Sequence, residues 1–378
     1  MCANANVAAI KAWSANLLLA VSLTVGCQPS SGTADPPDAS TAAADSGGGT
    51  DAALAAEPPV DCTETEQNLP ADVFCIGLYE HHDTHRHPSD VHPYTPGITF
   101  WSDGAEKQRY FYLPPGTQID TSDMDVWRFP VGTKAWKEFR FNDKLVETRI
   151  FYKRTETTWA SGTYLWNAEG TAAQLNTSRQ PVLVNDGYEI PTAKDCGKCH
   201  HGGADYLLGV EAVSLSLPTT QGLTLARLVE MGALSAPPNG NSIQLPEDAT
   251  GRAGAALGYL HANCGMPCHS TRGLGEETQL IMRLRATEFW TAPGVAATTP
   301  QVSDTDTYQA TINEQPKTKS VSSKFPGAQR IAPGSHDQSL VWILSHRRGE
   351  YQMPPLVSHQ IDEVGTRALS DWIDALTP

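Results

Sequence analysis

Cys196-Gly197-Lys198-Cys199-His200 is the stretch around which the chain is organised. Two cysteines separated by two residues, with a histidine directly after the second, form the attachment pattern of a c-type haem. On one helical turn the two thiols can reach both vinyl groups of a porphyrin, and the adjacent histidine can bind the iron. The sequence therefore predicts a covalent haem on Cys196 and Cys199, with His200 as a ligand of its iron.

A second motif of this kind lies at Cys264-Gly265-Met266-Pro267-Cys268-His269. Three residues separate its cysteines instead of two, but a histidine still follows directly. We predict a second covalent haem on Cys264 and Cys268, with His269 on its iron. The alternatives are a zinc ion held by four thiolates and a disulfide within either pair. Zinc does not require a histidine after each pair, and only 12 of 378 residues are histidine, so the two adjacent histidines favour haem.

The remaining iron ligands are less clearly marked. Met353 is followed by two prolines, which fix an extended loop with few backbone donors, so we expect its thioether to be the second ligand of the second iron. A methionine that only fills an apolar gap is the alternative. For the first iron the candidates are Met231, His201 and His261, of which Met231 is preferred. An iron with an open position would indicate a catalyst instead of a carrier.

Residues 1–26 have the features of a signal peptide. Lys11 precedes an apolar run over residues 12–25, which is too short to span a bilayer and has the length of a signal-peptide core. The run ends in Leu23-Thr24-Val25-Gly26-Cys27, which resembles a bacterial lipobox and implies lipidation of Cys27. An ordinary signal peptide cut nearby and an uncleaved anchor are the alternatives. All three place the protein outside the cytoplasm, and the lipid anchor predicts a periplasmic or outer-membrane lipoprotein.

Residues 27–61 are rich in Ala, Ser, Gly, Pro, Thr and Asp. This composition predicts a disordered acidic linker, because the segment cannot bury enough apolar surface to fold. Cys62 and Cys75 begin the folded part and predict a disulfide in an oxidising compartment, with two free thiols as the alternative. The net charge of −15 argues against nucleic acid and suits redox partners with a basic face.

Residues 62–190 predict an antiparallel β-rich domain. Apolar residues alternate with polar ones, and aromatic residues are enriched, over expected strands at 107–113, 134–141, 146–153 and 162–166. The tryptophans of this region are expected to form its core, although a ligand-binding face is the alternative. The histidine-rich stretch 81–92 lacks a helical or strand period, so we expect a solvated loop with incidental metal affinity.

For residues 191–378 we predict mostly α-helical, cytochrome c-like structure, with one haem motif in 191–245 and the other in 246–378. Together with the β-rich domain before it, this region gives the chain an α+β multidomain fold class. Helices are expected at 223–231, from a cap at Asp248 to Leu260, at 337–345 with a cap at Ser335, and at 362–376. Val364, Leu369 and Trp372 are expected on the apolar stripe of the last helix. Residues 279–325 are expected to be an insertion with possible strands.

The chain resembles bacterial dihaem c-type cytochrome lipoproteins over roughly residues 70–378. The resemblance is carried by short segments: FWSDGA at 100–105, LPPG at 113–116, FPVGT at 129–133, ETR at 147–149, YLHANC at 259–264, IAPG at 331–334 and MPP at 353–355. It implies two covalent haems and electron transfer outside the cytoplasm.

Two classes of function fit these patterns. The first is a dihaem electron carrier held at the membrane by its lipid. The second is a haem enzyme, such as a peroxidase or the cytochrome subunit of a dehydrogenase. We favour the carrier, because the sequence has no motif for the acid–base group of a peroxidase and no cofactor fingerprint of a dehydrogenase.

Overall fold

The computed structural model describes residues 60–184, 187–200, 205 and 207–377. The expected signal peptide, Cys27, nearly all of the linker, and His201 lie outside the described residues. Within the described part, no helix is both long enough and apolar enough to cross a bilayer.

The central element of the described residues is a seven-stranded antiparallel sheet with the strand order β6-β5-β4-β3-β2-β1-β9. Its strands are β1 (His92–Thr95), β2 (Glu106–Tyr112), β3 (Lys134–Phe141), β4 (Lys144–Lys153), β5 (Trp159–Trp166), β6 (Ala173–Leu175) and β9 (Gln221–Gly222). The expected strands are all present, and the ends of β3 coincide with the prediction. A separate hairpin pairs β7 (Val182–Val184) with β8 (Tyr188–Ile190). The sheet and the helices after it confirm an α+β fold.

The two faces of the sheet cover two different cores, because successive side chains of a strand point to opposite faces. Trp136, Ile150 and Tyr164 belong to a cluster with the segment that begins near Leu69. Phe111, Ala135 and Phe151 belong to a larger cluster that includes the C-terminal helices. Trp136 is 1% exposed and is therefore a core residue, as we expected for the tryptophans of the β-rich region.

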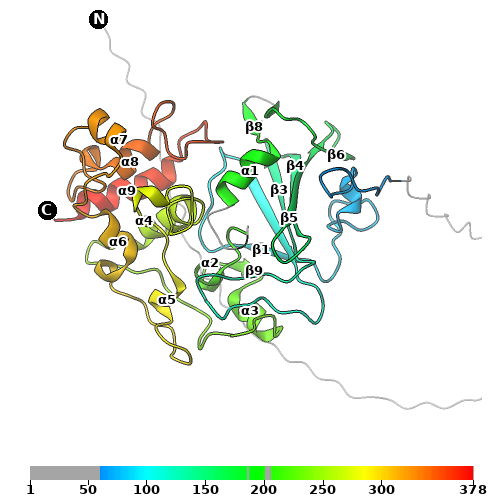
Figure 1. The fold of residues 1–378 in the computed structure, drawn as a ribbon, viewed down its shortest axis with the longest axis horizontal. Coiled ribbons are helices and arrows are strands. Elements are labelled where there is room, and N and C mark those ends of the chain that lie inside the picture. The colour runs from blue at the N-terminus through cyan, green and yellow to red at the C-terminus, as the bar shows by residue number, and fades with distance from the viewer. Residues whose placement is uncertain (1–59, 185–186, 201–204, 206, 378) are drawn as a thin grey trace, which may run out of the picture. The chain divides into compact units, whose positions relative to one another are not determined.

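Apart from β9, all strands of the sheet precede the α-helices in the chain, and Figure 1 shows α4, α8 and α9 gathered together. Their bounds are α1 (Ala193–His200), α2 (Ala212–Ser216), α3 (Leu225–Glu230), α4 (Ala253–Leu260), α5 (Ala286–Phe289), α6 (Asp306–Thr311), α7 (Lys319–Lys324), α8 (Leu340–Ser345) and α9 (Glu363–Ala375). Residues 279–325, for which the sequence suggests possible strands, contain loops and short helices and none of the named strands. Phe289 from this segment is fully buried in the same cluster as Phe151, so the segment contributes to the core.

Helix α9 packs across α4 at a glycine. A Cβ atom at Gly365 would lie 2.0 Å from Cε2 of Tyr259, so the helices approach too closely there for any side chain. Leu369 and Trp372 are buried as expected. Val364, which was expected on the buried stripe, is 83% exposed, because the close approach turns Gly365 and Thr366 towards α4 in its place.

Two expected helix caps differ in the structure. Glu247, not Asp248, accepts hydrogen bonds from the first backbone N–H groups of α4, at Ala253 (2.7 Å) and Gly254 (3.2 Å). Asp248 instead accepts from Thr250 and Trp372. Ser335 makes no side-chain cap, and the expected helix is divided into a short 3-10 turn and α8.

Cys62 and Cys75 form a disulfide, with their Cα atoms 5.3 Å apart. This is the pairing that the sequence predicted for the start of the folded part.

Candidate haem-binding site

Helix α1 carries the first cysteine motif. Asp195 N–H donates to the Thr192 hydroxyl at 3.3 Å, and that hydroxyl donates to the Asp195 carboxylate at 2.7 Å, which fixes the start of the helix. Cys196 and Cys199 are three residues apart on this helix and therefore lie on the same side. The local structure is thus the single helical turn that the haem interpretation requires.

The second motif lies on a π-helical turn, His261–Gly265, that continues from α4. His269 N–H donates to the Cys264 carbonyl at 2.8 Å, and Met266 N–H donates to the His261 carbonyl at 2.8 Å. Both bonds span five residues, whereas an α-helical bond spans four. The wider turn absorbs the additional residue between the cysteines. His269 therefore lies one π-helical turn after Cys264, just as His200 lies one α-helical turn after Cys196.

The two motifs approach each other at their second cysteines, where the thiols of Cys199 and Cys268 are close enough to change each other's pKa. The interaction with Cys268, with a further contribution from nearby Lys137, lowers the pKa of Cys199 to about 7. The same interaction and burial raise the pKa of Cys268. Cys196 and Cys264 are not in a disulfide, and burial raises the pKa of both thiols, in Cys264 to about 12.

A metal site of the zinc type would need at least three converging ligand side chains. No group of three His, Cys, Asp or Glu side chains that could hold a metal ion is present in the part of the chain that the structure describes.

His269 is held in the form that binds a metal. Burial, together with the charge of Arg330, lowers its pKa to about 4, so the ring is neutral at pH 7. Its Nδ1 lies 3.5 Å from the hydroxyl oxygen of Thr278. That hydroxyl donates its own proton to the Gly275 carbonyl at 2.6 Å, so we infer that Nδ1 carries the proton and donates. The lone pair of Nε2 is then available to iron, with Nδ1 oriented by a neighbouring oxygen as in many metal sites.

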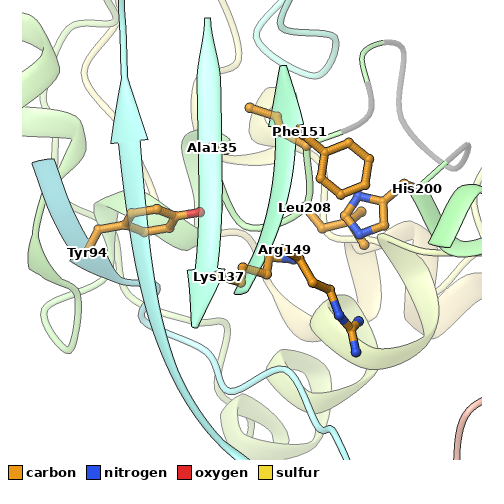
Figure 2. Close-up of a pocket in the computed structure, with 8 residues that line it drawn as sticks. Tyr94, Ala135, Lys137, Arg149, Phe151, His200 and Leu208 are labelled. Atoms are coloured by element: carbon orange, nitrogen blue, oxygen red, sulfur yellow. The ribbon is translucent and has the colours of Figure 1, made fainter. Parts of the chain in front are cut away.

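His200 lies against the sheet. Its ring stacks on Phe151, with 4.2 Å between centroids and 24° between planes. Figure 2 shows the two rings together, with Lys137 and Arg149 beside them. These side chains line a cavity of about 10 Å³, which is room for one water molecule. A porphyrin on His200 therefore requires its ring to leave Phe151.

The other expected ligands occupy different environments. Met353 is partly buried, and its N–H donates to the Leu344 carbonyl at 2.7 Å. Met231 ends α3 and is 36% exposed, and no contact in the described structure joins it to His200.

His261 is excluded as an iron ligand by its hydrogen bonds. It is fully buried, and its Nδ1 accepts from Leu284 N–H at 3.1 Å. Its Nε2 therefore carries the ring proton and lies 3.4 Å from the Glu211 carboxylate. Both ring nitrogens are thus engaged.

The histidine-rich stretch is partly structural. The His82 ring stacks on Phe74 with 4.8 Å between centroids. His87 Nδ1 lies 2.8 Å from the Leu78 carbonyl oxygen, and its ring packs on Tyr110. These two side chains pack against the smaller core and do not form the solvated loop that the sequence suggested.

The sequence indicated no role for residues 99–103. In the structure they contact Asn263, just before the second cysteine motif, and the loop that follows Met353. Asn263, just before Cys264, accepts a bond from Trp101 N–H (2.7 Å) and donates to the Thr99 carbonyl (2.9 Å). The buried Asp103 carboxylate accepts from the backbone of residues 359 and 360, at 2.7 and 3.2 Å, in the loop that follows Met353. The FWSDGA and YLHANC segments are the sequence features that contain Trp101, Asp103 and Asn263.

Neither a protein-family model, nor a curated protein, nor a solved structure matches this chain.

Proposed function

We propose that this chain is a dihaem c-type cytochrome that transfers electrons outside the cytoplasm, anchored to a membrane through a lipid on Cys27. The observation that carries the proposal is the proximity of the thiols of Cys199 and Cys268, each of which shifts the pKa of the other. Two attachment motifs that are far apart in sequence meet there at one place in the fold. A protein that passes single electrons between two centres needs its centres close together, whereas two unrelated cysteine pairs do not need to meet.

The residues of the two motifs fit the group that they would hold. A haem bound through thioethers supplies a one-electron redox centre at its iron. Cys196 and Cys199 would hold one haem, and Cys264 and Cys268 would hold the other. His200 and His269 would each bind an iron through a ring nitrogen, and the Thr278 oxygen orients the second ring.

Met353 is our proposed second ligand of the iron on His269. Its loop is fixed by Gln352, whose side-chain amide donates to the carbonyls of Pro354 (3.0 Å) and Ser358 (2.8 Å). The Asp103 carboxylate holds the backbone just beyond this loop. A loop fixed at both ends is suited to presenting a thioether in one position.

The proposed location has independent support from the disulfide. Disulfides persist in oxidising compartments, and Cys62 and Cys75 form one. Lipidation of Cys27 and cleavage after residue 26 rest on the sequence pattern alone. Redox proteins with a basic docking face remain the proposed partners, because the chain carries a net charge of −15.

The test is the intact mass of the mature protein, produced with a haem-maturation system, together with a pyridine haemochrome count. We expect two haems and a lipid on the chain. Replacing both cysteines of either motif by serine should remove one haem and leave the other. A wild-type chain without covalent haem would refute the proposal, and a cyanide- or peroxide-sensitive high-spin spectrum would favour the enzyme over the carrier.

A further inference from the structure

A row of hydrogen-bond donors crosses the sheet next to the first cysteine motif. Its members are register partners on successive strands β1 to β5: Tyr94, Arg109, Lys137, Arg149 and Thr163. Register partners lie about 5 Å apart at Cβ and point to the same face. Three neighbouring positions of this row are therefore cationic. Like charges directly opposite each other destabilise a sheet unless an anion lies between them.

Burial increases the cost of this arrangement. Arg109 is 6% exposed, and the Arg149 side chain is 18% exposed. Burial and the two flanking guanidinium groups lower the pKa of Lys137 to about 7. The row is thus an electrostatically unfavourable feature at the centre of the sheet, and it calls for a compensating negative charge.

The described residues supply only part of that charge. Glu147 binds Arg149 through two bonds, Nε–Oε2 at 2.8 Å and Nη2–Oε1 at 2.6 Å, and it also accepts the Tyr188 hydroxyl at 2.6 Å. Within the described residues, no acidic side chain pairs with Arg109 or Lys137.

One further contact and one buried hydroxyl group describe the row. The Arg109 guanidinium lies over the Phe100 ring, 5.8 Å from its centroid. The buried hydroxyl of Thr163, at the end of the row, has no hydrogen-bond partner among the residues that the structure describes. Two cations and one hydroxyl thus remain available to an acceptor.

The adjacent row of the same face is apolar. It consists of Phe111, Ala135 and Phe151, about 7 Å further along the strands. His200 stacks on Phe151, and Lys137 and Arg149 line the cavity beneath its ring (Figure 2). An apolar strip beside His200, bordered by cations, matches a flat apolar ligand with carboxylates along one edge.

We propose that Arg109, Lys137 and Arg149 form the binding site for the two propionate carboxylates of the haem attached at Cys196 and Cys199. The two negative charges of the propionates match the two cations that lack an acidic partner. The inference rests on the proposed function, because it requires haem at the first motif. It adds a recognition site on the sheet that neither cysteine motif indicates.

The test uses the haem-loaded full-length protein with Lys137→Gln and Arg109→Gln as separate variants. Lys134→Gln is the control, because Lys134 lies on β3 but on the opposite face, with its ammonium 4.9 Å from the centroid of the Tyr152 ring. The first readout is the propionate bending band in the resonance Raman spectrum, which responds to hydrogen bonding of the carboxylates. The second is the midpoint potential of each haem.

We expect the propionate band to shift in both variants and to stay unchanged in the control. We also expect the potential of one haem to fall, because a lost cation favours the ferric form. The expected size is about tenfold in the reduction equilibrium, which is about 59 mV for one electron.

The outcomes separate the two proposals. No haem on Cys196 and Cys199 in the wild-type protein would overturn both. An attached haem with an unchanged propionate band in both variants would overturn only this inference. A wild-type band that is unaffected by the variants, with phosphate or acetate binding that is lost in them, would show that the row holds a soluble anion instead. If Lys137→Gln fails to retain haem, recovery in Lys137→Arg supports the inference and continued loss contradicts it.

Discussion

Replacing Asp103 by alanine should destabilise the protein and release the Met353 loop. Asp103 is 5% exposed, and its two carboxylate oxygens accept backbone hydrogen bonds from His359 at 2.7 Å and Gln360 at 3.2 Å. Asp103→Ala leaves both N–H groups without this acceptor. It also places alanine at φ +46°, a left-handed conformation that aspartate tolerates better.

The magnitude follows from these contacts. A hydrogen bond to a charged group contributes about 1.5–3 kcal/mol, and the left-handed conformation costs alanine about 1 kcal/mol. Two bonds and the backbone strain together give a loss of at least about 4 kcal/mol in the free energy of unfolding. Asp103→Asn keeps one acceptor oxygen and tolerates the backbone conformation, so we expect it to lose about half as much.

Denaturant unfolding measures the stability, and the weak red absorption band of methionine-bound ferric haem reports the loop. Asp143→Ala is the matched control, because Asp143 has a similar φ of +61° but lies in an exposed hairpin turn. We expect that control to cost about 1 kcal/mol and to keep the absorption band. A loss in Asp103→Ala no greater than in Asp143→Ala, with the band intact, would refute the reasoning.

Three further predictions concern other parts of the site. Gly365→Ala should lower the free energy of unfolding by about 3 kcal/mol, since its methyl group would overlap the Tyr259 ring, 2.0 Å away. Burial alone would raise the pKa of Glu211, but its hydrogen bonds lower it from 4.5 to about 2. The stability that this carboxylate contributes, about 3 kcal/mol, should thus be present above pH 4.5 and be lost as the pH falls to about 2 in acid-unfolding measurements. Thr278→Val should raise the midpoint potential of the haem that we propose at Cys264 and Cys268, because the imidazole of His269 becomes a weaker donor to ferric iron when Nδ1 loses its partner.

Each of these has its own control. Gly254→Ala lies on α4, where the closest atom to the new methyl group would be the Glu247 carboxylate at 3.2 Å, followed by Leu245 Cβ at 3.5 Å and the Pro246 carbonyl oxygen at 3.6 Å. Its stability should therefore change much less than that of Gly365→Ala. Glu211→Gln should remove the stability loss between pH 4.5 and 2, and an unchanged acid profile would contradict the assignment. Thr278→Ser keeps the oxygen and should keep the wild-type potential. Equal potentials in the valine and serine variants would show that the oxygen has no influence.

The elements of regular structure were largely readable from the sequence. Period-two alternation located β3 at Lys134–Phe141, and the positions of α3 and α9 were found within two residues. The predictions were wrong where the packing of one segment against another decides which side chains are buried. Val364 fits the helical stripe but is exposed, because the approach of α4 at Gly365 sets which side of α9 is buried.

The candidate site was predictable only in part. The residue types and spacing of both cysteine motifs identified the candidate ligands, and the compartment argument identified the Cys62–Cys75 disulfide. The preference for Met231 has no structural support, since this residue is exposed at the end of α3. No local pattern could have excluded His261, whose two hydrogen-bond partners come from distant segments.

The sequence by itself determined which residues are the candidates for the chemistry, because motif spacing and side-chain period are properties of a few neighbouring residues. Only the tertiary structure decided what those residues meet. The π-helical turn that absorbs the additional residue before Cys268 could not be read from the motif. The proximity of that cysteine to Cys199 depends on how segments far apart in the chain pack together. The row through Lys137 depends on strand register, since a shift of one residue would turn every side chain of a strand to the other face.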